Sequence, residues 1–216
     1  MMLQSISKNA VILGLFAIAT AATLALTNEG TLQRIQCNKQ HALESSLLEV
    51  MPKALFDNAL LQDVIVVEDP SLARKPQHLY RARLNDKPAG VVIEASAPDG
   101  YGGAISLLVG IDASGDITGV RVVPPHNETP GLGDKVELKK SPWVLSFNGK
   151  SLDNTPKESW AVKKDGGAFD SFTGATITPR AVVAQVQRAL SYYQANADTL
   201  YAMPTQTATD TESCDG

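Results

Sequence analysis

The clearest structural signal lies between residues 91 and 123, which read VVIEASAPDGYGGAISLLVGIDASGDITGVRVV. Gly90 to Ala97 and Ala104 to Ile111 are largely apolar runs, and each predicts a β-strand. Turn-forming residues from Asp112 to Asp116 lead into Ile117 to Val123, which completes a hairpin.

Two further strands are predicted upstream of that stretch. Val64 to Val67 is almost wholly β-branched, and Leu79 to Leu84 alternates apolar and basic residues. Asn85 to Pro88 is a turn that joins the second of these strands to the next. Short strands joined mostly by hairpins predict an antiparallel sheet.

Helices are predicted on both sides of the sheet. Cys37 to Met51 has apolar residues at helical spacing, and shorter helical pieces are expected at Lys53 to Leu61 and Lys135 to Lys140. The final helix is expected to begin near Thr178, as its N-cap, and residues after about Ala195 are expected to form a flexible tail. Its apolar stripe consists of Val182, Val183, Val186, Ala189, Leu190 and Tyr193.

The order of these elements predicts an α+β fold: an antiparallel sheet with flanking helices, preceded by one N-terminal transmembrane helix. There is no repeated β-α alternation, which argues against a doubly wound sheet. Neither a G-x-G-x-x-G nor a G-x-x-x-x-G-K-[ST] motif occurs, so a Rossmann or P-loop nucleotide site is not supported.

Residues 9–28 carry no charge and are mostly apolar. A helix of this length spans about 30 Å, the thickness of a bilayer core. A cleavable signal peptide is the alternative, with Ala19 to Ala21 as a small-residue cleavage site, but the apolar run continues to Leu26. We favour a retained anchor. Lys8 and the amino terminus favour a cytoplasmic N-terminus, and both alternatives place the rest of the chain outside the cytoplasm.

Composition excludes several kinds of function. The net charge of −4 and the pI of about 5.4 argue against nucleic-acid binding, which requires a basic face. Cys37 and Cys214 lie near the two ends, in no C-x-x-C pair, and no metal site is expected. A disulfide between them is conceivable, but we favour two free thiols.

The most informative segment is Asp170 to Thr176, which reads DSFTGAT. It combines hydroxyl groups with Gly174 just before a predicted helix, and helix N-termini suit phosphate groups. Gly174 is expected to allow a close backbone approach, while Lys163, Lys164 and Arg180 can balance phosphate charge. From the residues alone, a Ser/Thr-rich loop that simply caps a helix is the commoner alternative.

This segment resembles the D-[SG]-x-[ST]-G-A-[ST] signature of an FMN-binding domain. The domain occurs in the G subunit of the Rnf (also called Rsx) electron transport complex and in the C subunit of the sodium-translocating NADH:quinone reductase. In this family a flavin transferase joins the FMN phosphate to the final hydroxyl, which implies a phosphoester at Thr176. The resemblance also implies that the cofactor contacts Asp170, Ser171, Thr173, Gly174, Ala175 and Lys163.

A second stretch, ETPGLG from Glu128 to Gly133, resembles another loop of the same family. Its two glycines predict a tight turn with exposed amides, and Leu132 is placed to cover the flavin ring. An ordinary solvated connecting loop is the alternative. The cofactor contacts implied here are Glu128, Thr129, Gly131, Leu132 and Gly133.

The resemblance implies a membrane-anchored electron-transfer protein with covalent FMN, working with other subunits of an inner-membrane complex and matured by a flavin transferase. The length and single anchor favour the Rnf type over the quinone-reductase type. No catalytic residue is expected, because the flavin supplies the chemistry. Residues 1–8 are expected in the cytoplasm, 9–28 in the membrane, 29–195 in an extracytoplasmic domain and 196–216 in the tail. The alternatives are a non-redox scaffold, a secreted binding protein and an independent flavoenzyme.

Overall fold

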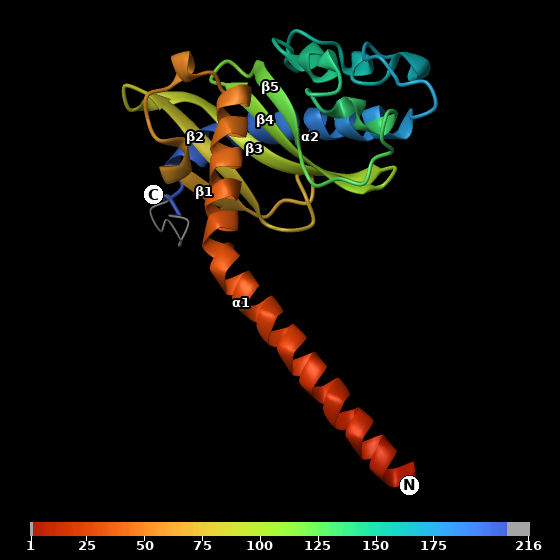
Figure 1. The fold of residues 1–216 in the computed structure, drawn as a ribbon. Coiled ribbons are helices and arrows are strands. Elements are labelled where there is room, and N and C mark those ends of the chain that lie inside the picture. The colour runs from red at the N-terminus through yellow and green to blue at the C-terminus, as the bar shows by residue number, and fades with distance from the viewer. Residues whose placement is uncertain (1, 207–216) are drawn as a thin grey trace. The chain divides into compact units, whose positions relative to one another are not determined.

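The computed structural model describes residues 2–206, which divide into two compact units, residues 2–43 and residues 44–206 (Figure 1). The first unit is purely helical. The second contains a sheet of five strands and a long C-terminal helix, which confirms the predicted α+β class.

Helix α1 covers Met2–Val50, so the predicted anchor and the predicted helix that starts at Cys37 belong to one continuous helix. In the first unit its apolar side chains are exposed; Phe16 and Leu26 are 70% and 71% exposed. This helix is long and apolar enough to cross a membrane. Cys37 is disulfide-bonded, which corrects the expectation of a free thiol; Cys214 lies outside the described residues.

All five predicted strands are present and form one antiparallel sheet in the order β1-β2-β3-β4-β5. Asn85 and Asp86, at the β2–β3 turn, have φ values of 52° and 61°, as a tight hairpin turn requires. The β3–β4 hairpin is longer than predicted and ends at a tip formed by Tyr101 and Gly102. The strands are β1 (Val64–Val67), β2 (Gln77–Leu84), β3 (Lys87–Gly100), β4 (Gly103–Asp112) and β5 (Ile117–Val123).

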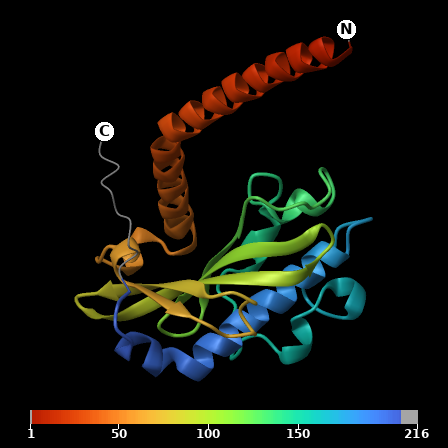
Figure 2. The same cartoon turned by 90° about the horizontal axis from the view of Figure 1, so that it is seen from below.

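Helix α2 (Ile177–Ala202) lies along one face of this sheet, as Figure 2 shows. The predicted apolar stripe is buried, with Val182, Val186 and Leu190 at most 2% exposed, and it packs with the inward-facing residues of β3 and β4. The predicted N-cap was wrong. Thr176 occupies the cap position, whereas Thr178 lies within the first turn and is buried.

The last turn of α1 lies in the second unit and is buried against the sheet through Leu47 and Val50. Gly110 of β4 makes this contact possible. A Cβ atom at Gly110 would lie 2.3 Å from the carbonyl oxygen of Val50, so any side chain there would force the helix end off the sheet. The hydroxyl of Thr118 donates a hydrogen bond to the same carbonyl.

We therefore expect Gly110→Ala to lower the free energy of unfolding of the globular unit by about 1–3 kcal/mol through overpacking. Chemical unfolding followed by tryptophan fluorescence measures it. Ser106→Ala, at an exposed position of the same strand, is the matched control and should change stability by less than about 0.5 kcal/mol. Equal effects of the two substitutions would contradict the close approach at Gly110.

The C-terminal part of the chain is more ordered than the sequence predicted. Helix α2 continues to Ala202, past the expected start of the tail at residue 196, and the amide of Gln206 donates to the carbonyl of Val64 at 2.8 Å. Arg81 of β2, which is 1% exposed, binds the carbonyls of Leu200 and Met203 at 3.0 and 2.6 Å. These bonds explain why the helix end is held against the sheet. Residues 207–216 of the expected tail lie outside the described residues.

Candidate functional site

The segment from Asp170 to Thr176 forms a compact turn directly before α2. The amide of Ala175 donates to the carbonyl of Phe172 at 3.0 Å. Gly174 has a φ of +82°, a conformation that residues with side chains rarely adopt. A Cβ at Gly174 would meet only Leu132 Cδ2, at 3.9 Å, so the conformation of the turn, and not packing against the protein, requires the glycine.

An aromatic cluster that the sequence did not reveal supports this turn. Phe172 and Phe169 are buried, and Trp143 meets Phe172 edge-on at 5.3 Å between ring centroids. Phe147 stacks on Phe169 at 4.5 Å. The indole nitrogen of Trp143 also donates to the carbonyl of Asp170 at 2.8 Å. Because these rings are rigid and buried, they fix the backbone from which the hydroxyl groups of the turn project.

Thr176 occupies the N-cap position of α2, but its backbone is helical (φ −75°, ψ −24°) and its side chain makes no capping hydrogen bond. The hydroxyl is therefore not consumed by the helix, in contrast to an ordinary threonine cap. The first amides of the helix have no carbonyl acceptor within the helix itself. A hydroxyl group thus lies beside a helix N-terminus, where the partial positive charge favours a phosphate.

The ETPGLG stretch folds as a tight turn beside the signature. The carbonyl of Thr129 accepts hydrogen bonds from the amides of Leu132, Gly133 and Asp134, at 3.1, 2.9 and 3.3 Å. Those amides are turned inward, which corrects the expectation that they would be exposed. The Leu132 side chain is 39% exposed and lies next to Gly174, so the structure brings the two motifs together.

Glu128 is 5% exposed, so it does not belong to a solvated loop. Its Oε1 accepts the amide of Gly102, at the tip of the β3–β4 hairpin, at 2.9 Å. Its Oε2 accepts a hydrogen bond from the hydroxyl of Thr178, in the first turn of α2. With both carboxylate oxygens engaged, Glu128 ties three segments of the site together. Gly133 leaves room for this pair, since a Cβ there would lie 2.9 Å from each partner atom.

Replacing Glu128 with alanine should lower the free energy of unfolding by about 1.5–3 kcal/mol, because two hydrogen bonds to a buried carboxylate are lost. Denaturant unfolding checks this value. Glu137→Ala, which removes a half-buried carboxylate that contacts His126, is the control and should cost less. An equal or smaller loss for Glu128→Ala would contradict its role as the central hydrogen-bond acceptor.

Two of the three cations that were predicted to balance phosphate charge, Lys163 and Arg180, form ion pairs. Lys163 Nζ lies 2.7 Å from Asp170 Oδ1, and both side chains are exposed. Arg180 forms a two-atom contact with Asp165, and this hydrogen bonding lowers the pKa of the Asp165 carboxyl. Lys163 and Arg180 are thus each paired with an aspartate, and the Lys163–Asp170 pair lies at the signature itself.

The other residues that were predicted to contact the cofactor are exposed or half-buried. Thr173 is exposed, whereas Ser171, Ala175 and Thr129 are half-buried. Asp134, which directly follows the ETPGLG stretch, is 7% exposed, and its Oδ1 has no hydrogen-bond partner among the described residues. Because this oxygen is itself buried, it is not accessible to a molecule bound at the surface, and an ordered water is the usual partner of such an acceptor. The sequence placed Asp134 in the loop but gave no signal for its burial.

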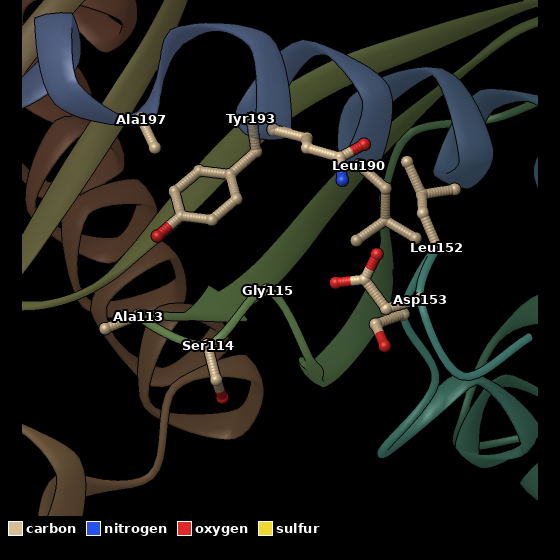
Figure 3. A pocket seen from close by; sticks show the side chains of 10 residues that line it. Ala113, Ser114, Gly115, Leu152, Asp153, Leu190, Tyr193 and Ala197 are labelled. Atoms are coloured by element: carbon tan, nitrogen blue, oxygen red, sulfur yellow. The ribbon is translucent and has the colours of Figure 1, made fainter.

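A small hollow of about 180 Å³ lies elsewhere, between the β4–β5 turn and the second half of α2. Figure 3 shows Tyr193 and Leu190 facing Ser114 and Asp153 across it. A typical ligand pocket occupies about 300–1,000 Å³, so this hollow is too small for a nucleotide. The signature residues do not line it, and the candidate site is an open surface formed by the two turns.

Two family models match parts of this chain. Residues 100–191 match the FMN-binding domain family, and residues 1–50 match the RnfG N-terminal region. The chain is similar to the G subunit of the ion-translocating oxidoreductase complex of Pseudoalteromonas atlantica, with 47% identity over 93% of this chain and 94% of the relative. The chain belongs to the RnfG family. The corresponding protein of Pseudomonas aeruginosa is 49% identical over 92% of this chain and 94% of its own length.

Membership of the RnfG family decides between the two complexes that the sequence suggested, in favour of the Rnf type. It also confirms an FMN-binding domain, and the domain match includes both turns described above. Together with the apolar part of α1, it supports anchoring in a membrane.

Proposed function

We propose that this chain carries FMN as a phosphoester on Thr176 and relays electrons within an ion-translocating oxidoreductase complex. The observation that carries the proposal is the Thr176 hydroxyl, which makes no capping bond although it lies at the start of a long helix. Its position as the last hydroxyl of the signature, in a chain of the RnfG family, supports attachment there.

Each part of the site has a role in this proposal. The first amides of α2 and Lys163 face the phosphate charge, and the ion pair with Asp170 holds Lys163 at the turn. Leu132 and Ile177, which are 39% and 47% exposed, offer apolar surface to the ring. The flavin, when bound, supplies one-electron and two-electron redox chemistry, and the protein holds and orients it.

We infer that the globular unit lies outside the cytoplasm, on the periplasmic side of a bacterial inner membrane. Lys8 precedes the apolar segment, and positive charge favours the cytoplasmic side. The disulfide at Cys37, beyond that segment, agrees with an oxidising compartment. A covalent bond is useful there, because a lost cofactor would not be replaced from a cytoplasmic pool.

The partners in this proposal are the other subunits of the membrane complex and a flavin transferase that forms the ester. The relatives are named as parts of an ion-translocating complex, which supports the first partner. The chemistry of esterification supports the second, since no hydrogen bond among the described residues joins an acid–base group to the Thr176 hydroxyl. The expected cofactor contacts of the signature and of the ETPGLG stretch remain part of this proposal.

The test is expression of the full chain with and without a flavin transferase, followed by mass analysis of the denatured protein. We expect a gain of one FMN, less one water, only when the transferase is present, and a flavin-bearing peptide that contains Thr176. Reduction of the modified chain should then bleach its flavin absorbance. An unmodified mass in the presence of an active transferase would refute covalent attachment, and a flavin on a different peptide would refute the assigned residue.

A further inference from the structure

A second, larger hollow of about 700 Å³ lies on the globular unit, apart from the flavin signature. The segment that joins β1 to β2, the outer parts of β3 and β4, and α2 all contribute to its walls. We call it the basic groove, and its three cationic residues are Arg74, Lys75 and Arg188. Arg188 is twelve residues along α2 from Thr176, a separation of about 18 Å along the helix axis.

The basic groove is built around a buried polar side chain. Gln185 of α2 is 1% exposed, and its amide nitrogen donates to the carbonyls of Ser71 and Leu72, at 2.9 and 3.0 Å. Its amide oxygen accepts two hydrogen bonds from Arg188, at 2.9 Å from Nε and 2.7 Å from Nη2. Gln185 therefore fixes the Arg188 guanidinium and ties it to the segment that carries Arg74 and Lys75.

The positive charge of the basic groove is not neutralised within the described part of the chain. None of its lining residues is acidic, and no carboxylate among the described residues forms an ion pair with Arg74, Lys75 or Arg188. The nearby carboxylate of Asp69 accepts the amide of Ser71 at 2.8 Å. A guanidinium that is oriented by a neutral amide keeps its charge for an external anion.

The other lining residues and the volume of the groove indicate which class of anion it can bind. Ser96 and Ser106 are direct cross-strand partners. Because they alternate along their strands with residues that pack under α2, their side chains lie on the face of the sheet that α2 does not cover. Pro98 and Ala104 add apolar surface beside them. An oriented guanidinium beside further cations is typical of phosphate recognition, and the volume falls within the range of small-molecule pockets, about 300–1,000 Å³.

We propose that the basic groove binds a phosphate-bearing ligand, with Arg188 as the oriented donor and with Arg74 and Lys75 as further cations. The source of the phosphate is either a free phosphorylated molecule or a phospholipid head group. The site is separate from Thr176, so its occupancy does not depend on the proposed flavin attachment.

The probe is inorganic pyrophosphate, titrated by calorimetry into the full chain in phosphatidylcholine nanodiscs. We expect saturable binding to one site, weakened about tenfold by Arg188→Gln through loss of a charge-assisted contact. The double variant Arg74→Gln, Lys75→Gln, at exposed positions of a loop, should weaken binding similarly without disturbing the core. Lys157→Gln, an exposed cation outside the groove, is the matched control and should bind as the unaltered chain does.

Absence of saturable binding, or equal weakening by Lys157→Gln, would overturn the proposal. Tighter binding of an oligoglutamate peptide, with the same dependence on Arg188, would overturn it in favour of an acidic protein partner. The two phosphate sources are separated with glycerophosphoglycerol, a soluble phosphodiester head group. Competition with pyrophosphate supports a lipid source, and failure to compete supports a free phosphorylated molecule.

Discussion

Replacing Thr176 with alanine is expected to remove all denaturation-stable flavin from the chain. The substitution deletes the oxygen through which the proposed phosphoester forms, so no flavin can be attached at this position. The hydroxyl makes no capping hydrogen bond, so the fold and the free energy of unfolding should change little. In-gel flavin fluorescence and the mass of the denatured chain, after expression with a flavin transferase, measure the outcome.

Two further variants make that result specific. Thr176→Ser keeps a hydroxyl at the same position and should restore attachment, although at a reduced extent if the transferase requires the methyl group. Thr199→Ala removes an exposed hydroxyl near the other end of α2 and should leave the flavin in place. Flavin that survives denaturation in Thr176→Ala would show that another residue carries the ester.

The largest loss of stability is expected from Arg81→Met. Arg81 is 1% exposed and joins Asp63, the carbonyls of Leu200 and Met203, and the hydroxyl of Thr205. Its removal leaves buried acceptors without a donor, and breaking a buried ion pair in this way costs about 3–5 kcal/mol. Denaturant unfolding should show this loss, and proteolysis should begin at the C-terminal end of α2.

Arg83→Met is the matched control, because Arg83 also binds Asp63, at 2.6 Å, but its side chain is 26% exposed. We expect a loss of about 1 kcal/mol or less for this more exposed pair. Equal losses for the two arginines would contradict the special role of the buried one.

The cluster of Arg81, Arg83 and Asp63 also predicts how the free energy of unfolding depends on pH. Burial alone would raise the pKa of Asp63, but hydrogen bonds from Arg83 and Arg81 outweigh it and lower that pKa below its usual 3.8. A depressed pKa in the folded state contributes stability that is present above the unfolded value and is lost as the pH falls through the folded value. The unaltered chain should therefore lose more stability than Arg81→Met when the pH is lowered below about 4.

Much of the fold was predictable because its signals are local. Hairpin turns at residues 85–88 and 112–116 separate runs with strand character, and an antiparallel meander needs no long-range information to set its order. The length of α2 was not predictable. Residues 196–202 are rich in small and polar types, and Arg81, more than a hundred positions away, holds that end in place.

The candidate site likewise has some features that the sequence predicts and others that it does not. The signature at Asp170 to Thr176 is visible in the sequence, and so is the ETPGLG stretch. The burial of Glu128 was not, because a glutamate between an asparagine and a threonine looks like part of a solvated loop. Its partners, Gly102 and Thr178, come from a hairpin tip and a helix start, and only folding brings them together.

The sequence by itself determined the apolar N-terminal segment, the five strands, the family and the hydroxyl proposed to carry the flavin, since each of these depends on short, contiguous patterns. Only the tertiary structure decided that Thr176 does not cap its helix, that Glu128 joins three segments, and that Arg74, Lys75 and Arg188 line one groove. These features depend on contacts between distant residues. Whether a side chain is buried or its charge is paired depends on which distant residues fold against it, so local residue patterns do not reveal it.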